Sequence, residues 1–228
     1  MVKQYLRTLW DELRREPVPL FPAGLLLVAT VTLTVSHDQR IVSFLSSKLP
    51  QLSDSKGIEF YDLYCFVLLF IFPAAYVKLT GRKLRDFGLC WGKVKIALPL
   101  FVLFLVLLTV FGYLASRIGS FERFYGSVTP ANFREVLLLF VANFVFMWGW
   151  EFMHRGFLLQ GLRDYVGGLA IFIQLVPFVI LHLDKPPFEL YGSIIFGLAF
   201  GYYAYLTRSF VYPVFLHAYF ATLTRALL

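Results

Sequence analysis

Charged residues are scarce in this sequence. Lysine, arginine, aspartate and glutamate make up 15% of the 228 residues, whereas hydrophobic residues make up 59%. A soluble domain usually carries about 25% charged residues, so this composition excludes an ordinary water-soluble fold. The apolar residues fall into blocks of roughly 17–25, the length that an α-helix needs to cross the hydrocarbon core of a bilayer. We therefore predict an all-α polytopic membrane protein.

Cysteine is also rare. Of the two cysteines, Cys65 lies within an apolar block and Cys90 in a short basic loop, and no Cys-x-x-Cys motif is present. This pattern indicates neither a disulfide framework nor a cysteine metal site.

The first residues lack the small-residue cleavage site of a signal peptide. A basic start is followed by a stretch whose apolar residues share one helical face, with charged residues around the other. We expect residues 1–17 to form an amphipathic helix at the membrane interface, ended by Pro17 and Pro19.

The formal net charge of +7 comes from basic residues spread over the connecting segments. They are not interleaved with exposed aromatic residues, as they would be in a nucleic-acid-binding surface. Membrane lipids with anionic headgroups, and not nucleic acid, are therefore the expected partner.

The hydropathy pattern predicts about seven transmembrane helices. They are expected at residues 19–36, 58–79, 96–117, 136–161, 167–183, 189–206 and 210–227. No linker is long enough to separate domains, so residues 1–228 are predicted to form a single membrane domain. Lysine and arginine are more frequent at the span ends on the N-terminal side, which predicts a cytoplasmic N-terminus. We expect a bacterial inner membrane, because the chain is compact and carries no organelle signal.

A few ionisable residues lie within or at the ends of these spans, where an unpaired charge costs several kcal/mol. Glu151 and Arg155 are four residues apart on one helical face, where the carboxylate and the guanidinium can meet. His182 ends the fifth expected span, and His217 lies in the middle of the seventh. Glu151 and Arg155 by themselves can be a structural ion pair that fixes helix packing, and a lone histidine can be a packing residue. Together, three helices that each contribute an ionisable group favour a functional site.

Hydrolysis is the chemistry that such a set supports. A carboxylate can take a proton from water, and imidazole groups can orient the water or stabilise the developing oxyanion. A divalent metal such as zinc, bound by Glu151, His182 and His217, is a weaker alternative because the chain lacks an HExxH motif. We expect no cofactor.

These residues also carry a family resemblance. Glu151-x-x-x-Arg155, then Phe178-x-x-x-His182, then His217 in a final helix resembles the CPBP family of intramembrane peptidases. This family includes CAAX prenyl endopeptidases and bacteriocin-processing proteins, and its members are glutamic-type proteases. The resemblance covers roughly residues 80–228, the expected catalytic core.

Two positions depart from the family pattern of two adjacent glutamates and a final His-x-x-x-Asn or Asp. Trp150 stands in the place of the first glutamate, and Ala221 in the place of the Asn or Asp. The first glutamate is commonly given the water-activating role, which leaves Glu151 either to take that role or to remain the partner of Arg155. Three further residues are candidates for supporting roles, namely Glu189, Asn143 and His154. Glu189 can instead be a helix-terminal charge, and Asn143 a link between helices.

The resemblance implies an intramembrane endopeptidase that cuts a membrane-anchored or lipidated protein near the membrane. Removal of a C-terminal anchor or sorting segment is one such reaction. The roles expected are Glu151 as general base, His182 and His217 as water-orienting or oxyanion-stabilising groups, and Arg155 as the residue that positions Glu151. One alternative is a catalytically inactive family member that acts as a membrane scaffold or chaperone, which Trp150 and Ala221 favour. The absence of an internal repeat argues against the other alternative, a proton-coupled transporter.

Overall fold

The computed structural model describes residues 19–48, 60–126 and 129–228, and these residues form helices without strands. The interfacial helix expected at residues 1–17 lies outside the described residues. The helices of the N-terminal part are α2 (Leu20–His37), α3 (Gln39–Lys48), α4 (Phe60–Phe66), η2 (Val67–Ile71), α5 (Phe72–Leu79), η3 (Leu84–Phe87), α6 (Val94–Ser116) and α7 (Gly119–Tyr125). The C-terminal part contains α8 (Phe133–Glu151), η5 (Phe152–Gln160), α9 (Gly161–Val166), α10 (Leu169–Ile180), α11 (Pro187–Thr207) and α12 (Val211–Ala226).

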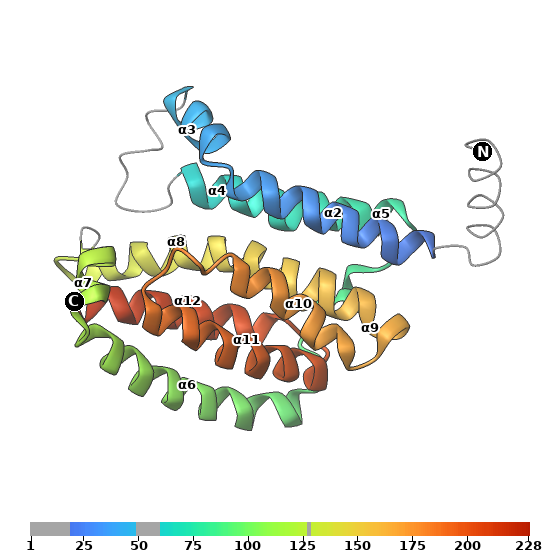
Figure 1. Ribbon diagram of the computed structural model, residues 1–228. Helices are drawn as coiled ribbons and strands as arrows, with labels where there is room; N and C mark the ends of the chain where they lie inside the picture. The colour runs from blue at the N-terminus through green and yellow to red at the C-terminus, as the bar shows by residue number, and fades with distance from the viewer. Residues whose placement is uncertain (1–18, 49–59, 127–128) are drawn as a thin grey trace, which may run out of the picture.

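The helices are arranged in layers (Figure 1). The layer formed by α2 and by α4, η2 and α5 covers one side of a bundle that contains α8, α10, α11 and α12. Helix α6 covers the opposite side and packs against α11 and α12. Helix α12 thus lies between α6 and α8, so a side chain in its middle can face the interior of the bundle.

Within the described residues, five helical segments are long and apolar enough to cross a membrane. They are Leu20–His37, Phe60–Leu79, Val94–Ser116, Phe133–Val166 and Pro187–Thr207. The two other expected spans, 167–183 and 210–227, are helical in α10 and α12, but these helices have only 12 and 16 residues. These two helices are shorter than the roughly 20 residues that a straight span needs, so five of the about seven expected spans are supported by length and composition, and the other two stay predictions. The chain is nevertheless an all-α integral membrane protein.

Helix α6 shows how the fold suits a lipid environment. Its outward residues recur every four positions and are strongly exposed, with Leu98 at 54%, Val102 at 60%, Val106 at 57% and Val110 at 54%. An apolar surface of this kind is unfavourable in water but is satisfied by lipid chains. Several polar residues, among them Glu151, His154 and Arg155, are instead buried inside the bundle.

Helix α8 has a well-defined start, which fixes the helix that carries the central ion pair. The Asn132 side chain accepts a hydrogen bond from the Glu135 backbone N–H at 3.1 Å, and the Glu135 carboxylate accepts one from the Ala131 N–H at 2.9 Å. These reciprocal bonds resemble a capping box. Helix α8 then continues without interruption through η5 and α9 to Val166.

The η5 segment is a π-helix that begins directly after Glu151. All nine of its residues are buried, including His154 and Arg155. Such wider turns are uncommon and are frequently found at functional sites. Here the π-helix begins where the chain presents its charged pair to the interior.

Gly92 allows the loop before α6 to approach the end of α11. Its backbone is left-handed, with φ of 55°, and an added Cβ would overlap the Thr207 carbonyl group. We expect Gly92→Ala to lower the free energy of unfolding by about 1–2 kcal/mol for the backbone strain and a further 1–3 kcal/mol for the overlap.

Unfolding in mixed micelles, followed by circular dichroism, measures this loss. The matched control is Gly81→Ala, because Gly81 also has a positive φ, of 75°, but nothing lies within 4 Å of its added Cβ. Equal losses in the two variants would contradict the close approach at Gly92.

Candidate active site

Glu151 is the centre of a buried polar cluster. One of its oxygens, Oε1, lies 3.3 Å from Nη1 of Arg155 and 2.7 Å from Nδ1 of His217. The side chains of Glu151 and Arg155 are fully buried, and that of His217 is 16% exposed. The i, i+4 contact expected between Glu151 and Arg155 is therefore present, and the structure adds His217 from α12 to the same carboxylate.

The Arg155 guanidinium contacts an aromatic ring as well as the Glu151 carboxylate. Its guanidinium carbon lies 4.0 Å from the centre of the Phe178 ring, on α10. Within the described part of the chain, Nε and Nη2 of Arg155 and Oε2 of Glu151 are buried without hydrogen-bond partners. The ion pair and the cation–π contact are therefore the main compensation for burying the guanidinium.

His182 is held by the backbone of the preceding helical turn. Its Nδ1 lies 2.6 Å from the Phe178 carbonyl oxygen. Because a carbonyl only accepts, Nδ1 carries the hydrogen and donates it, which leaves Nε2 with a lone pair. The Trp150 ring packs beside the imidazole, with 5.8 Å between ring centres.

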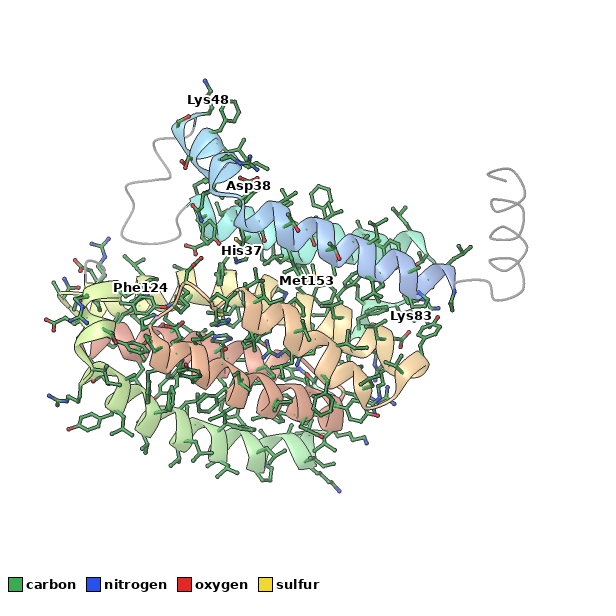
Figure 2. All side chains as sticks on the ribbon, in the orientation of Figure 1. His37, Asp38, Lys48, Lys83, Phe124 and Met153 are labelled. Atoms are coloured by element: carbon green, nitrogen blue, oxygen red, sulfur yellow. The ribbon has the colours of Figure 1, made fainter. Side chains whose placement is uncertain are left out.

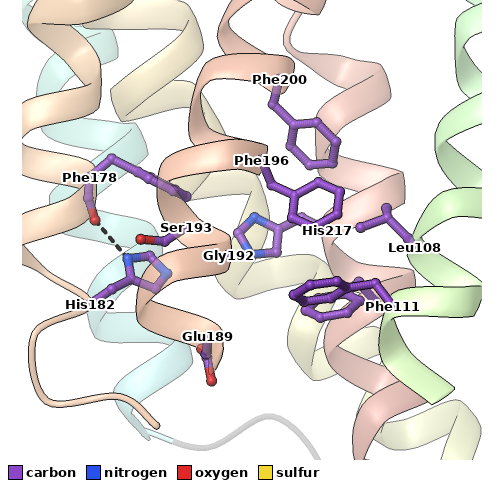
Figure 3. Close-up of a pocket in the computed structure, with 11 residues that line it drawn as sticks. Leu108, Phe111, Phe178, His182, Glu189, Gly192, Ser193, Phe196, Phe200 and His217 are labelled. Carbon is purple, nitrogen blue, oxygen red and sulfur yellow. Dashed lines mark hydrogen bonds between the residues drawn. The ribbon is translucent and has the colours of Figure 1, made fainter. Parts of the chain in front are cut away.

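His182 and His217 line one cavity, although they come from separate segments (Figure 3). The cavity volume is about 50 Å³, enough for ordered water. Its polar lining also includes Glu189 and Ser193. The remaining walls are Leu108, Phe111, Phe178, Gly192, Phe196, Phe200 and Phe220. The site is thus an apolar chamber with few polar groups, as is usual for small binding pockets.

Glu151 and Arg155 are not among the residues that line this cavity. His217 stands between them and the chamber, because its ring lines the cavity while its Nδ1 contacts Glu151. The carboxylate that lines the chamber belongs to Glu189, in the first turn of α11. The Glu189 carboxylate accepts the hydrogen bond of the Tyr125 hydroxyl, whose oxygen lies 3.0 Å and 2.8 Å from the two carboxylate oxygens.

The two other supporting candidates lie outside the cavity lining. Asn143 donates a hydrogen bond to the Thr222 hydroxyl at 2.9 Å and so links α8 to α12. His154 is fully buried, and its Nδ1 lies 2.8 Å from the Trp150 carbonyl oxygen. Both residues therefore contact neighbouring protein groups and not the chamber.

Sequence reasoning missed His37 and Tyr125. His37 ends α2, where this helix meets the bundle, and its ring centre lies 5.8 Å from that of Trp150 (Figure 2). Trp150 thus packs against His37, His154 and His182, which come from three segments. The sequence holds only four histidines, a scarcity that could have drawn attention to His37. Tyr125 gave no comparable signal.

The zinc alternative named Glu151, His182 and His217 as ligands. In the described ranges, no group of three or more histidine, cysteine, aspartate or glutamate side chains is arranged to hold a metal ion. The Glu151 and His217 side chains bond to each other, and His182 bonds to the backbone.

Comparison with protein families gives a match to the C-terminal part of the chain. Residues 132–223 match the family model described as Type II CAAX prenyl endopeptidase Rce1-like. No curated protein and no solved structure matches the chain. The matched residues run from the N-cap of α8 into α12, and they include Glu151, Arg155, His182 and His217. The match confirms the resemblance to the CPBP intramembrane peptidases, over less than half of the chain.

Proposed function

Because residues 132–223 match a family of membrane proteases, we propose that this protein is an intramembrane endopeptidase in which His217 activates water. Its substrate is a membrane-anchored or lipidated protein, from which it removes a C-terminal anchor or sorting segment. The observation that carries the proposal is the contact of 2.7 Å between His217 and buried Glu151, at the wall of a chamber that His182 also lines.

The Glu151 carboxylate sets the tautomer of His217. A carboxylate accepts a hydrogen bond, so Nδ1 of His217 carries the hydrogen, and Nε2 keeps the lone pair that can take a proton. The acidic member of a Ser-His-Asp triad acts on its histidine in the same way. Glu151 is therefore a positioning residue in this proposal, since it does not line the chamber, and the proton passes to His217 and not directly to Glu151.

His182 orients the water. Its Nε2 has a lone pair, because Nδ1 donates to the Phe178 carbonyl, so Nε2 can accept a hydrogen bond from the same water molecule. This tautomer favours the water-orienting role over donation to an oxyanion. Two imidazole acceptors on one small chamber can hold a water molecule with its oxygen turned toward a peptide carbonyl.

The reaction follows from this arrangement and uses no cofactor. The water oxygen bonds to the carbonyl carbon of the scissile peptide, and the water proton passes to Nε2 of His217. The tetrahedral intermediate then expels the nitrogen of the peptide bond, which takes the proton from His217 and leaves as an amine. His217 returns to its neutral form, and the other product is a carboxylic acid.

The walls of the chamber suit an apolar peptide. Phenylalanine side chains from α6, α10, α11 and α12 surround the two histidines. A chamber of about 50 Å³ admits a side chain and water but not a folded domain. The substrate is therefore expected to enter as an extended segment.

Mass spectrometry of membranes that contain the protein and candidate anchored substrates tests this function. We expect the wild-type chain to cut near the membrane end of a substrate. His182→Ala is expected to lower kcat by about 10²-fold, because the attacking water loses a group that orients it. The control is Tyr202→Phe, because Tyr202 is 49% exposed on α11 and lies outside the chamber.

A scaffold or chaperone role is the second candidate, and Trp150 is the observation that favours it. The buried indole ring occupies the position of the family's first glutamate and lies 4.8 Å from the ring centre of His154. If the wild-type chain cuts none of a broad panel of anchored proteins but binds some of them, the scaffold role replaces the peptidase.

A further inference from the structure

Four residues form a charged cluster beside the chamber, which we call the mouth cluster: Tyr125, Lys185, Glu189 and Arg225. Glu189 belongs to both the cluster and the chamber lining, on the first turn of α11 (Figure 3). The Tyr125 hydroxyl donates to Glu189 and accepts a hydrogen bond from Nζ of Lys185 at 3.2 Å. The Arg225 guanidinium carbon lies 5.2 Å from the centre of the Tyr125 ring.

The mouth cluster holds two cations and one carboxylate. Among the described residues, neither Lys185 nor Arg225 has a carboxylate within ion-pair distance, and Glu189 is bonded by Tyr125 instead. Asp184 is the adjacent acidic residue, and it is exposed. The four residues of the cluster therefore place two cations and one carboxylate next to the chamber, and the exposed Asp184 carboxylate also acts on Lys185.

Lys185 is partly withdrawn from solvent. Its Nζ lies 4.9 Å from the centre of the Phe124 ring and 5.3 Å from that of Tyr125. Burial lowers the pKa of Lys185, and the nearby Glu189 carboxylate opposes this effect. A cation in this setting gains more from an added anion than a solvated surface lysine would, because less water screens the interaction.

Among the described residues, one hydrogen bond is made by Lys185, to Tyr125, and none by the Arg225 side chain. Lys185 has three N–H groups and Arg225 has five, so both cations keep donors for a further acceptor. Cations near a peptide-binding chamber, with aromatic residues that hold them in place, fit a carboxylate of the peptide itself.

We propose that Lys185 and Arg225 form a subsite that binds a carboxylate of the substrate, placed just beyond the segment that occupies the chamber. This inference rests on the proposed function, because it assumes that a peptide lies in the chamber. The carboxylate can be the end of the peptide chain or an aspartate or glutamate side chain near that end. The shared chemistry is a single carboxylate at the mouth of the chamber.

Binding of fluorescent peptides to the purified full-length protein in nanodiscs tests the subsite without requiring cleavage. Three peptides with the same apolar segment are compared: one with a free C-terminal carboxylate, one with a C-terminal amide, and one with the amide and an aspartate next to it. We expect the amide peptide to bind about tenfold more weakly than the free acid, as for the loss of one charge-assisted hydrogen-bonded contact. If the peptide with aspartate binds as tightly as the free acid, a side-chain carboxylate is sufficient for binding at the subsite. If it binds as weakly as the amide, the C-terminal carboxylate is the ligand.

Single substitutions test whether Lys185 and Arg225 bind the carboxylate. Lys185→Gln and Arg225→Gln are expected to weaken binding of the free acid toward that of the amide, and to change binding of the amide little. Lys185→Arg keeps the charge and should retain the preference for the free acid. The matched control is Arg117→Gln, because Arg117 is exposed at the end of α6 and contacts Tyr113, away from the chamber.

Equal binding of all three peptides by the wild-type protein would overturn the subsite, and this result does not depend on any variant folding. Lys185→Gln and Arg225→Gln proteins that both keep the full wild-type preference for the free acid over the amide would also overturn it. A protein that prefers the acid but never cuts it would retain the subsite and overturn the peptidase. A protein that cuts the acid and amide peptides with equal KM would retain the peptidase and overturn the subsite.

Discussion

Replacing Glu151 with glutamine is expected to lower kcat for peptide cleavage by about 10³–10⁴-fold while changing KM little. The magnitude follows from triads in which an amide replaces the carboxylate and stabilises the wrong histidine tautomer. Here the glutamine N–H₂ can donate to Nδ1 of His217, which moves the hydrogen to Nε2 and removes the lone pair that faces the chamber. Single-turnover and steady-state cleavage of a labelled anchored peptide measure the two constants.

A second comparison separates positioning from general damage. His217→Gln should lose about as much activity as Glu151→Gln, and the double variant should lose little more, because the two residues act as one unit. Glu122→Gln, on the exposed side of α7, is the control for loss of a carboxylate. If the fold decrease in kcat of the double variant equals the product of the two single decreases, Glu151 does not act through His217.

Replacing Arg155 with methionine is expected to destabilise the protein by about 3–5 kcal/mol, the cost of leaving one member of a buried ion pair without its partner. The Glu151 carboxylate would then be fully buried with His217 as its remaining contact, and the cation–π contact with Phe178 would also be lost. Unfolding in mixed micelles, followed by tryptophan fluorescence, measures the loss.

The paired change Arg155→Met with Glu151→Gln should recover most of that stability, because it removes both charges from the apolar interior. Arg123→Met, at an exposed position of α7, controls for the loss of an arginine. A single variant that is as stable as this control would contradict the account of Arg155 as the counter-charge of Glu151.

The membrane fold could be predicted because its signal is simple. Long apolar blocks must be helical in lipid, so the segments at α2, α6 and α11 follow from hydropathy alone. The lengths of α10 and α12 could not be predicted in this way, since apolar residues continue past the ends of these helices. The π-helical turns after Glu151 also leave no mark in the composition, because the same residues would fit an α-helix.

The residues of the candidate site could be predicted better than the contacts between them. The spacing of Glu151 and Arg155 places them on one helical face, and the structure has them in contact. The contact between Glu151 and His217 depends on how α8 packs against α12, which a single sequence does not specify. The sequence offered Glu189 as a supporting residue close to His182, and both line the chamber, but it did not indicate that Glu151 would lie outside the lining.

Tyr125 illustrates a further limit. It lies on a short helix far from Glu189 in the sequence, and only the packing of α7 beside the start of α11 brings the two together. His37 likewise reaches Trp150 from a helix outside the region that resembles the peptidase family. Residues that reach a site from distant parts of the sequence are not marked by a local sequence motif.

Cleavage of an anchored substrate by the wild-type protein and by His217→Gln, followed in native membranes by mass spectrometry, tests whether His217 activates water. We expect a defined cut near the membrane with the wild-type protein and a loss of at least about 10²-fold in the folded variant. Cleavage that continues unchanged in His217→Gln would contradict the proposed role of His217 as the group that activates water.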